Sequence, residues 1–347
     1  MSADLLEDLR ATTRKALSAG SGDVVDELDL AGLLVDSDLG GLGLGDREMA
    51  LVSTELGRAL SPSSFLPSAV LAATLLTHAG TDAATELLAG LVAGDTRCAV
   101  AVADADGSWA MSTSPVVAVP ADPGWLLNGT VWGISTPSQP DTLLTVASTG
   151  DGVALFAMAA DDVEIALADQ LDPARGLIGV VLSDAPARLL SGRDAATKAL
   201  EEAYRRGLLA VGAEQLGVAR TCLETAVGYA KTRSQFGSPI GSFQAIKHRC
   251  AEVLVHVELA DAALDQAVDS GASVDAELAF TVATSAALSA AESCIHIHGG
   301  IGFTWEHRAH RSLRRARVNA TLMGPSAVHR DAIAASAGLK TGEAVRK

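Results

Sequence analysis

The chain has 347 residues, enough for two or three domains or for one large enzyme subunit with a sizeable core. Hydrophobic residues make up 48% and charged residues 20%, and Gly and Pro are scattered along the chain, so the composition excludes a disordered protein. The net charge of −16 argues against general binding to nucleic acid or to an anionic membrane.

The N-terminal sequence and the cysteines indicate a reducing compartment. Residues 1–17 are polar and acidic, where a secretory signal would start basic and continue apolar. No run of about 18 apolar residues is present to span a membrane. The cysteines are far apart and have no CxxC spacing, which predicts neither disulfides nor a zinc site. They are Cys98, Cys222, Cys250 and Cys294. We therefore expect a cytoplasmic protein without a metal.

Residues 1–95 are predicted to form an N-terminal helical domain. Apolar residues recur three and four positions apart, as in amphipathic helices, most clearly over residues 46–60 and 67–80. The segment VDSDLGGLGLGD, residues 35–46, is rich in Gly and Asp and predicts a loop.

Residues 96–190 are predicted to form a β domain, because the period changes to short β-type runs separated by Gly, Asp and Pro. These runs are 98–103, 114–121, 142–147, 152–159, 163–168 and 177–182. No helical pattern alternates with them, which argues against a parallel βαβ sheet and favours an antiparallel sheet or a small barrel.

Residues 191–347 are predicted to form a C-terminal four-helix bundle. Long Ala- and Leu-rich segments run over 193–232, 243–270, 273–298 and 311–337. The fold class is therefore α+β and multidomain. The helices at 243–298 carry more apolar surface than one chain can cover, so we expect an oligomer.

A polar joint, YAKTRSQFGSPIGSFQ (229–244), separates the first two of these helices. Arg233 lies where one helix ends, and an arginine at such a corner can make forked bonds to phosphate oxygens. The alternative interpretation is an exposed arginine that caps a helix.

A second polar segment, IHIHGGIGFTWEH (295–307), places two glycines after a long helix, where the backbone could approach a cofactor closely. His296 and His298 are either hydrogen-bonded structural residues or ligands; their spacing does not put them on one helix face, which argues against a helical metal site. We interpret the basic segment 307–317 as a solvated or buttressing helix face, although a phosphorylated cofactor could use part of it.

These motifs resemble those of the acyl-CoA dehydrogenase family, flavoenzymes built from a helical domain, a β domain and a C-terminal four-helix domain. The resemblance covers nearly the whole chain. Residues 35–60 look like the N-terminal signature, 127–135 (LNGTVWGIS) like the β-domain signature, and 233–247 with 296–302 like the C-terminal pair.

The resemblance implies FAD as the cofactor and an acyl-CoA as the substrate. It implies that one group of residues holds the pyrophosphate and adenosine part of an FAD bound mainly by a neighbouring subunit. This group is Arg233, Gln235, Phe236, Gln244, His296, Gly299 and Gly300. Ser135 matches the family's hydroxyl that bonds the flavin ring, although Gly133 stands where a Trp is usual; otherwise Trp132 and Ser135 are ordinary strand residues.

The family's reaction removes the α proton of the thioester while a hydride leaves the β carbon, so a carboxylate base is needed. In most members the base is a Glu before Gly-Thr, and here Met323 takes that place and Pro325 that of the Thr. In other members it lies on the helix before the Arg-x-x-Phe-Gly motif, a position that Gly207 takes here. Three carboxylates lie near in the sequence, and we expect the helix to point them elsewhere. They are Glu201, Glu202 and Glu214.

The departures share a pattern. The family's Thr-Glu-Pro motif is also altered, to VADADGS at 102–108, so groups that serve the subunit's own site are lost while groups that serve a neighbour's FAD remain. This resembles the non-catalytic partner of bacterial heteromeric acyl-CoA dehydrogenases, some of which act on steroid side-chain thioesters. Two alternatives stay open: a self-sufficient homo-oligomer with a relocated base, and a flavin-free structural homologue.

Overall fold

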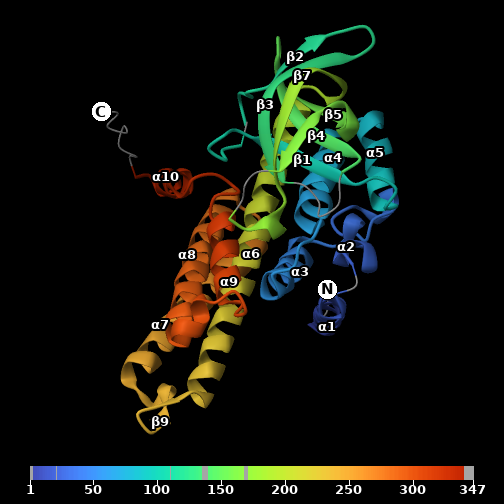
Figure 1. The fold of residues 1–347 in the computed structure, drawn as a ribbon. Coiled ribbons are helices and arrows are strands. Elements are labelled where there is room, and N and C mark those ends of the chain that lie inside the picture. The colour runs from blue at the N-terminus through green and yellow to red at the C-terminus, as the bar shows by residue number, and fades with distance from the viewer. Residues whose placement is uncertain (1–2, 21, 110, 135–139, 168–170, 340–347) are drawn as a thin grey trace, which may run out of the picture.

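The computed structural model describes residues 3–20, 22–109, 111–134, 140–167 and 171–339. Helices come first, a sheet follows, and helices end the chain, which confirms the predicted fold class (Figure 1). The N-terminal helices are α1 (Ala3–Ala19), α2 (Val24–Glu27), α3 (Asp46–Ala59), α4 (Ala73–Ala79) and α5 (Asp82–Val92).

The segments predicted to be helical near the N-terminus are confirmed, but part of one of them is a π-helix and not an α-helix. Helix α3 starts where the Gly45 N–H donates to the Glu48 carboxylate at 2.8 Å, which closes the first turn. The segment predicted at 67–80 begins earlier, as a buried π-helical stretch over Phe65–Ala72 that continues into α4.

The sheet has seven strands among the described residues. They are β1 (Cys98–Ala103), β2 (Val117–Pro120), β3 (Trp125–Ile134), β4 (Thr142–Thr149), β5 (Gly152–Ala159), β6 (Glu164–Leu167) and β7 (Leu177–Ser191). Most pairs are antiparallel, as predicted, but β1 lies parallel to β4, with Cys98 opposite Thr142, and β2 meets β4 in one parallel pair. Because β1 pairs with both β3 and β4, the pairings β1–β3–β7–β5–β4–β1 form a closed ring.

The C-terminal bundle is built around α6 (Arg193–Thr232), which runs from the sheet to the far end of the bundle (Figure 1). Helices α7 (Gln244–Ser270), α8 (Ser273–His298) and α9 (Ala309–Asn319) pack with it. The helix predicted at 311–337 is wrong as a single element. It divides into α9 and α10 (Ser326–Ser336), because Gly324 has φ +106° and Pro325, which cannot continue a helix, follows it.

Helix α8 is the most apolar long helix that the structure describes. Together with the turn that follows, over Ser273–Phe303, it is long and apolar enough to cross a membrane by length and composition, and its most apolar stretch of 18 residues has a mean hydropathy of 1.4. Within that stretch 61% is buried against the rest of the protein, as in the core helix of a bundle.

Helices α3 and α6 cross at very close range through two glycines. A Cβ on Gly57 would lie 2.0 Å from the Glu214 carbonyl oxygen, and one on Gly217 would lie 2.0 Å from the Thr54 carbonyl oxygen. Both contacts are to backbone atoms, which cannot move away by a change of rotamer as a side chain can. The crossing therefore requires a residue without a side chain on each helix.

We predict that Gly217→Ala lowers the free energy of unfolding by about 1–3 kcal/mol, because the methyl group forces the two helices apart. Gly228→Ala in the same helix is the matched control, since a Cβ there meets nothing within 4 Å in the described part of the chain. The control should raise stability by about 0.5–1 kcal/mol through helix propensity. Urea unfolding of both variants checks this, and equal effects would contradict the close crossing.

Candidate functional site

A cavity of about 390 Å³ lies at the junction of the sheet with the helices. Its walls come from β1 and the turn after it, from β3 and β7, from Leu71, and from Thr321 and Leu322 beyond α9. Most of the lining side chains are apolar, including Trp109 and Trp132. Such a cavity suits a flat or aliphatic ligand better than a charged one.

The two positions that the resemblance gives for the base lie against each other beside this cavity. Met323 is fully buried, and a Cβ on Gly207 would lie 2.6 Å from its Cε and 3.2 Å from its Sδ. The missing side chain on α6 thus makes the room that the thioether fills. Two positions 116 residues apart in the sequence are one place in the structure.

The nearby carboxylates are engaged elsewhere. Glu202 forms ion pairs with Arg205 at 2.6 Å and Arg206 at 3.0 Å. Burial alone would raise the pKa of Glu202, but the hydrogen bond and charge of Arg205 outweigh it and lower the pKa. Glu201 is exposed. Neither Glu201 nor Glu202 lines the cavity.

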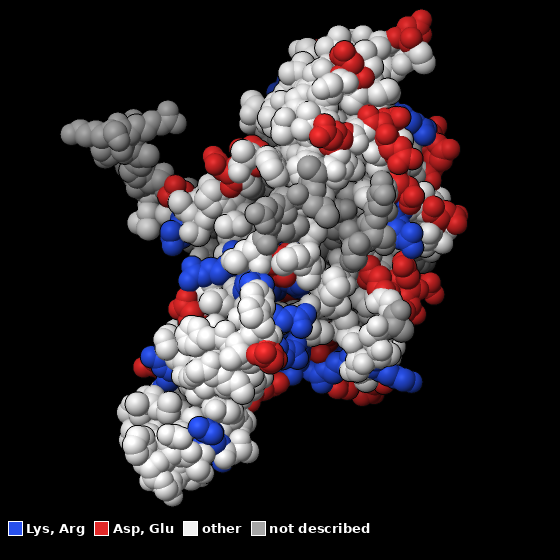
Figure 2. Space-filling model, in the orientation of Figure 1, with Lys and Arg blue, Asp and Glu red and all other residues white. Residues whose placement is uncertain are grey.

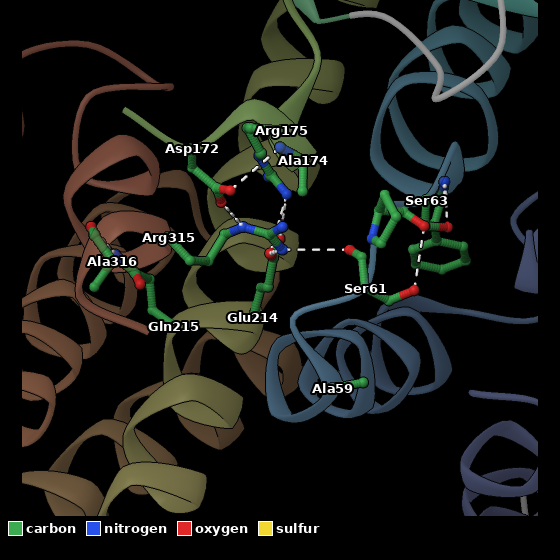
Figure 3. A network of polar contacts seen from close by, with 12 residues as sticks. Ala59, Ser61, Ser63, Asp172, Ala174, Arg175, Glu214, Gln215, Arg315 and Ala316 are labelled. Atoms are coloured by element: carbon green, nitrogen blue, oxygen red, sulfur yellow. Dashed lines mark hydrogen bonds and ion pairs between the residues drawn. The ribbon is translucent and has the colours of Figure 1, made fainter. Parts of the chain in front are cut away.

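Glu214 lies in a buried ionic cluster that joins several segments (Figure 3). It accepts hydrogen bonds from Arg175 at 2.7 Å and from Arg315 at 2.8 Å, and Arg315 also pairs with Asp172. Burial would raise the pKa of Glu214, but the two arginines together hold it below its ordinary value. A carboxylate so held is a poor proton acceptor at neutral pH.

A second buried polar chain supports the loop that carries Met323. The Tyr204 hydroxyl donates to the Met323 carbonyl oxygen at 3.1 Å. His329, fully buried, pairs with Glu277 and contacts the Gly324 carbonyl oxygen at 3.2 Å. Sequence reasoning missed the Glu277–His329 pair and the partners of Arg315, since residues 52 and 143 positions apart give no local signal.

The altered segment 102–108 forms a tight turn at the rim of the cavity. The Asp104 carboxylate accepts the backbone N–H groups of Asp106 at 2.9 Å and Ser108 at 3.0 Å. This carboxylate is used to hold its own loop, in the manner of an Asx turn. The residues that replace the Thr-Glu-Pro motif therefore shape the rim.

Gly133 has a structural reason for lacking a side chain. A Cβ there would lie 2.1 Å from the Val100 carbonyl oxygen, so the backbone of β1 fills the space that a Trp would need. The neighbouring Trp132 ring lies against Gly179 instead. Ser135, predicted to bond a flavin ring, lies outside the described residues.

The polar joint is a hairpin at the far end of the bundle. Arg233 ends α6, and β8 (Ser234–Gln235) pairs with β9 (Ser238–Pro239). Phe236, at φ +52°, and Gly237, at φ +77°, form the tip, and Phe236 is 91% exposed. Arg233 and Gln235 are exposed, as is Gln244 at the start of α7. These four predicted residues therefore gather on one loop.

The two-glycine turn after α8 lies at the same end. His298 stacks on Tyr229 with ring centroids 4.4 Å apart, which brings Gly299 and Gly300 to the last turn of α6, just before Arg233. A Cβ on either glycine would meet nothing within 4 Å among the residues that the structure describes. His298 is buried and bonds the Cys294 carbonyl oxygen at 2.7 Å, whereas His296 is exposed.

The basic segment mainly buttresses the fold, as the sequence indicates. Arg315 is buried in the ionic cluster, Arg317 pairs with Glu292 at 2.7 Å, and Arg308 donates to the carbonyl oxygens that end α3. Figure 2 shows Lys and Arg grouped over the middle of the molecule, and Asp and Glu mostly over the sheet and the N-terminal helices. In that view the far end of the bundle carries few charges.

Two family models match this chain. Residues 19–95 match the acyl-CoA dehydrogenase N-terminal domain, and residues 191–338 match the acyl-CoA dehydrogenase C-terminal domain. Among curated relatives, acyl-CoA dehydrogenase FadE34 of Mycobacterium tuberculosis is 34% identical over 86% of this chain. The chain spans only 39% of the length of FadE34. Acyl-CoA dehydrogenase IpdE2 of the same organism is 32% identical, over 86% of this chain and 80% of its own length.

Solved structures agree over almost the whole fold. The steroid ACAD Tcur3481–Tcur3483 is 27% identical, with a TM-score of 0.85, over 97% of this chain and 99% of that one. The ChsE4–ChsE5 complex of Mycobacterium tuberculosis is 26% identical, with a TM-score of 0.84, over 99% of each chain. With both domain models matched and relatives above 30% identity, the chain belongs to the acyl-CoA dehydrogenase family.

Proposed function

We propose that this chain is a subunit of a heteromeric acyl-CoA dehydrogenase that completes the FAD site of a partner subunit and has no catalytic base of its own. The observation that carries the proposal is the contact of Met323 with Gly207. Both family positions for the base are filled by groups that cannot accept a proton at neutral pH. The remaining groups of the chain then serve binding and assembly.

The far end of the bundle has the chemistry that a dinucleotide's phosphates require. Arg233 is exposed at the end of α6, and a guanidinium makes forked, charge-assisted bonds to phosphate oxygens. Gly299 and Gly300 leave open space where a side chain would stand, so a ligand could lie directly on the backbone. When bound, FAD supplies the hydride acceptor of the family's reaction; Arg233, Gln235, Phe236, Gln244, His296, Gly299 and Gly300 would hold its pyrophosphate and adenosine part.

Exposed apolar side chains support an oligomer. Phe236 at the hairpin tip is 91% exposed, and Leu254, Val255 and Leu259 on α7 are each about half exposed. Burying an aromatic side chain removes about 150–250 Å² of surface from water. A partner subunit that covers these side chains would therefore stabilise the complex. Two structural relatives with two named components, Tcur3481–Tcur3483 and ChsE4–ChsE5, support a homologous chain as that partner.

We further propose a CoA thioester as the substrate of the complex and the cytoplasm as its location. The steroid ACAD among the structural relatives supports an acyl group carried on a steroid. The apolar cavity of about 390 Å³ next to Met323 is compatible with such a ligand or with a ring of the cofactor.

One observation favours the self-sufficient alternative. Glu277 is a buried carboxylate close to the loop of Met323, and a relocated base would have to be of this kind. However, Glu277 pairs with His329 and does not line the cavity. The heteromeric assignment therefore has the better support.

We predict that the chain purified alone carries neither FAD nor acyl-CoA dehydrogenase activity, and that both appear on co-expression with a base-containing homologue. In that complex Arg233→Ala should weaken FAD binding about 10- to 100-fold, the loss of about 1.5–3 kcal/mol from a charged hydrogen-bonding group. Arg188→Ala is the control, because Arg188 is exposed on the sheet and pairs only with Glu86 among the contacts described. Flavin absorbance and FAD titration measure both effects.

Stoichiometric FAD and turnover by the chain alone would refute this proposal and require a relocated base. Absence of flavin with every homologue tested would instead support the flavin-free structural alternative. Equal FAD affinity in the two arginine variants would remove Arg233 from the site.

We also predict that the effect of Gly207→Ala on stability changes sign when Met323 is replaced by Ala. Gly207→Ala should lower stability in the natural chain, because its methyl group meets Met323 at 2.6 Å. In a Met323→Ala background the same change should raise stability, since it fills vacated space and favours the helix. Chemical unfolding of the four proteins gives the coupling, expected at about 0.5–3 kcal/mol for contacting residues. Additive effects would mean that the two residues do not touch.

A further inference from the structure

The buried guanidinium of Arg175 has two nitrogen atoms without a hydrogen-bond partner among the described residues. It lies just before β7, and its side chain is only 8% exposed. Nη1 donates to both oxygens of Glu214, but Nε and Nη2 are buried and make no hydrogen bond with the part of the chain that the structure describes. Each buried polar atom left in that state costs about 1–3 kcal/mol. The pair Nε and Nη2 forms the parallel edge of the guanidinium, which can hold one acceptor with two bonds.

Arg175 lines a small cavity of about 20 Å³. Ser53 of α3 also lines it, and its hydroxyl is buried and without a hydrogen bond among the described residues. Figure 3 shows Arg175 and Glu214 on one side and Ser61 and Ser63, which also line the cavity, on the other. Two residues from distant segments, each with an unpaired buried polar atom among the described residues, thus line one cavity.

We propose that this cavity binds one water molecule, which accepts hydrogen bonds from Arg175 Nε and Nη2 and donates one to Ser53 Oγ. A buried water needs about 10–15 Å³ and makes about three hydrogen bonds. The volume of about 20 Å³ is large enough for one water. A single molecule satisfies all three unpaired atoms.

The charges around the cavity favour water over a small anion. Arg175 and Arg315 are balanced by Glu214 and Asp172 in the same cluster (Figure 3). A halide would add one unbalanced charge against apolar walls that include Phe65. Burying an unpaired ion is far more costly than burying a hydrogen-bonded water.

The water would link α3 to the segment that leads into β7, and through Glu214 to α6. Leu177 and Ile178, which follow Arg175 closely in the chain, line the cavity of about 390 Å³. The proposed water site is therefore two residues along the chain from a wall of the candidate functional site. This inference depends on the geometry of the chain and does not depend on the proposed function.

The test is a crystal structure of the protein, with its partner if it requires one, from crystals grown with and without sodium bromide. We expect a single density peak within hydrogen-bonding distance of Arg175 Nε, Arg175 Nη2 and Ser53 Oγ. Diffraction at the bromine absorption edge should give no anomalous signal there. A bromide peak would overturn the assignment to water, and so would Arg175 Nε and Nη2 bonded to a protein group.

Stability gives a second measurement. Ser53→Ala removes one of the water's partners, and Ser191→Ala is a matched control, because its hydroxyl is also buried and unpaired among the described residues but lies outside this cavity. We expect the urea midpoint to fall further for Ser53→Ala than for Ser191→Ala. Equal midpoints for the two variants would contradict a water bound at Ser53.

Discussion

Glu214 is the residue on which the arrangement of the three parts of the molecule depends. Its carboxylate binds Arg175 before the last long strand and Arg315 of the basic helix. Its backbone carbonyl is the atom against which Gly57 of α3 packs. Removing one partner from such a buried ionic group leaves an uncompensated charge, which costs about 3–5 kcal/mol. The N-terminal helices, the sheet and the bundle therefore all contact Glu214 on α6, the first by backbone packing and the other two by ion pairs.

Helix α6 also separates the two proposed functional regions of the chain. Gly207 lies beside the cavity, and Arg233 ends the helix 26 residues later, roughly 40 Å away at 1.5 Å per residue. At that distance a side chain at one end makes no direct contact with the other end. The proposed loss of groups for the subunit's own reaction is therefore compatible with retention of the groups proposed to face a neighbour.

Periodicity and turn chemistry were enough to predict most elements, because each signal lies within a few residues. The exceptions have physical causes. Gly324 and Pro325 interrupt the last predicted helix, and the parallel pairing of β1 with β4 depends on partners more than 40 residues apart. For the candidate site, local motifs indicated Arg233, Gly299, Gly207 and Met323, and their roles stay predictions. The contact between the last two, and the pairing of Arg315 with Asp172, could not be predicted, since tertiary packing alone determines which distant side chains meet.

The exposed tip of the hairpin bears on how long an unassembled chain persists in the cell. Phe236 sits at a positive φ in a two-residue turn, where its ring contacts only the edge of Phe243 among the described rings and is 91% exposed. A newly made copy therefore presents this ring to water, and in the proposed complex it does so until another subunit covers it. Chaperones and proteases act on unassembled chains of this kind. The supply of the partner would then set how many copies persist in the cell.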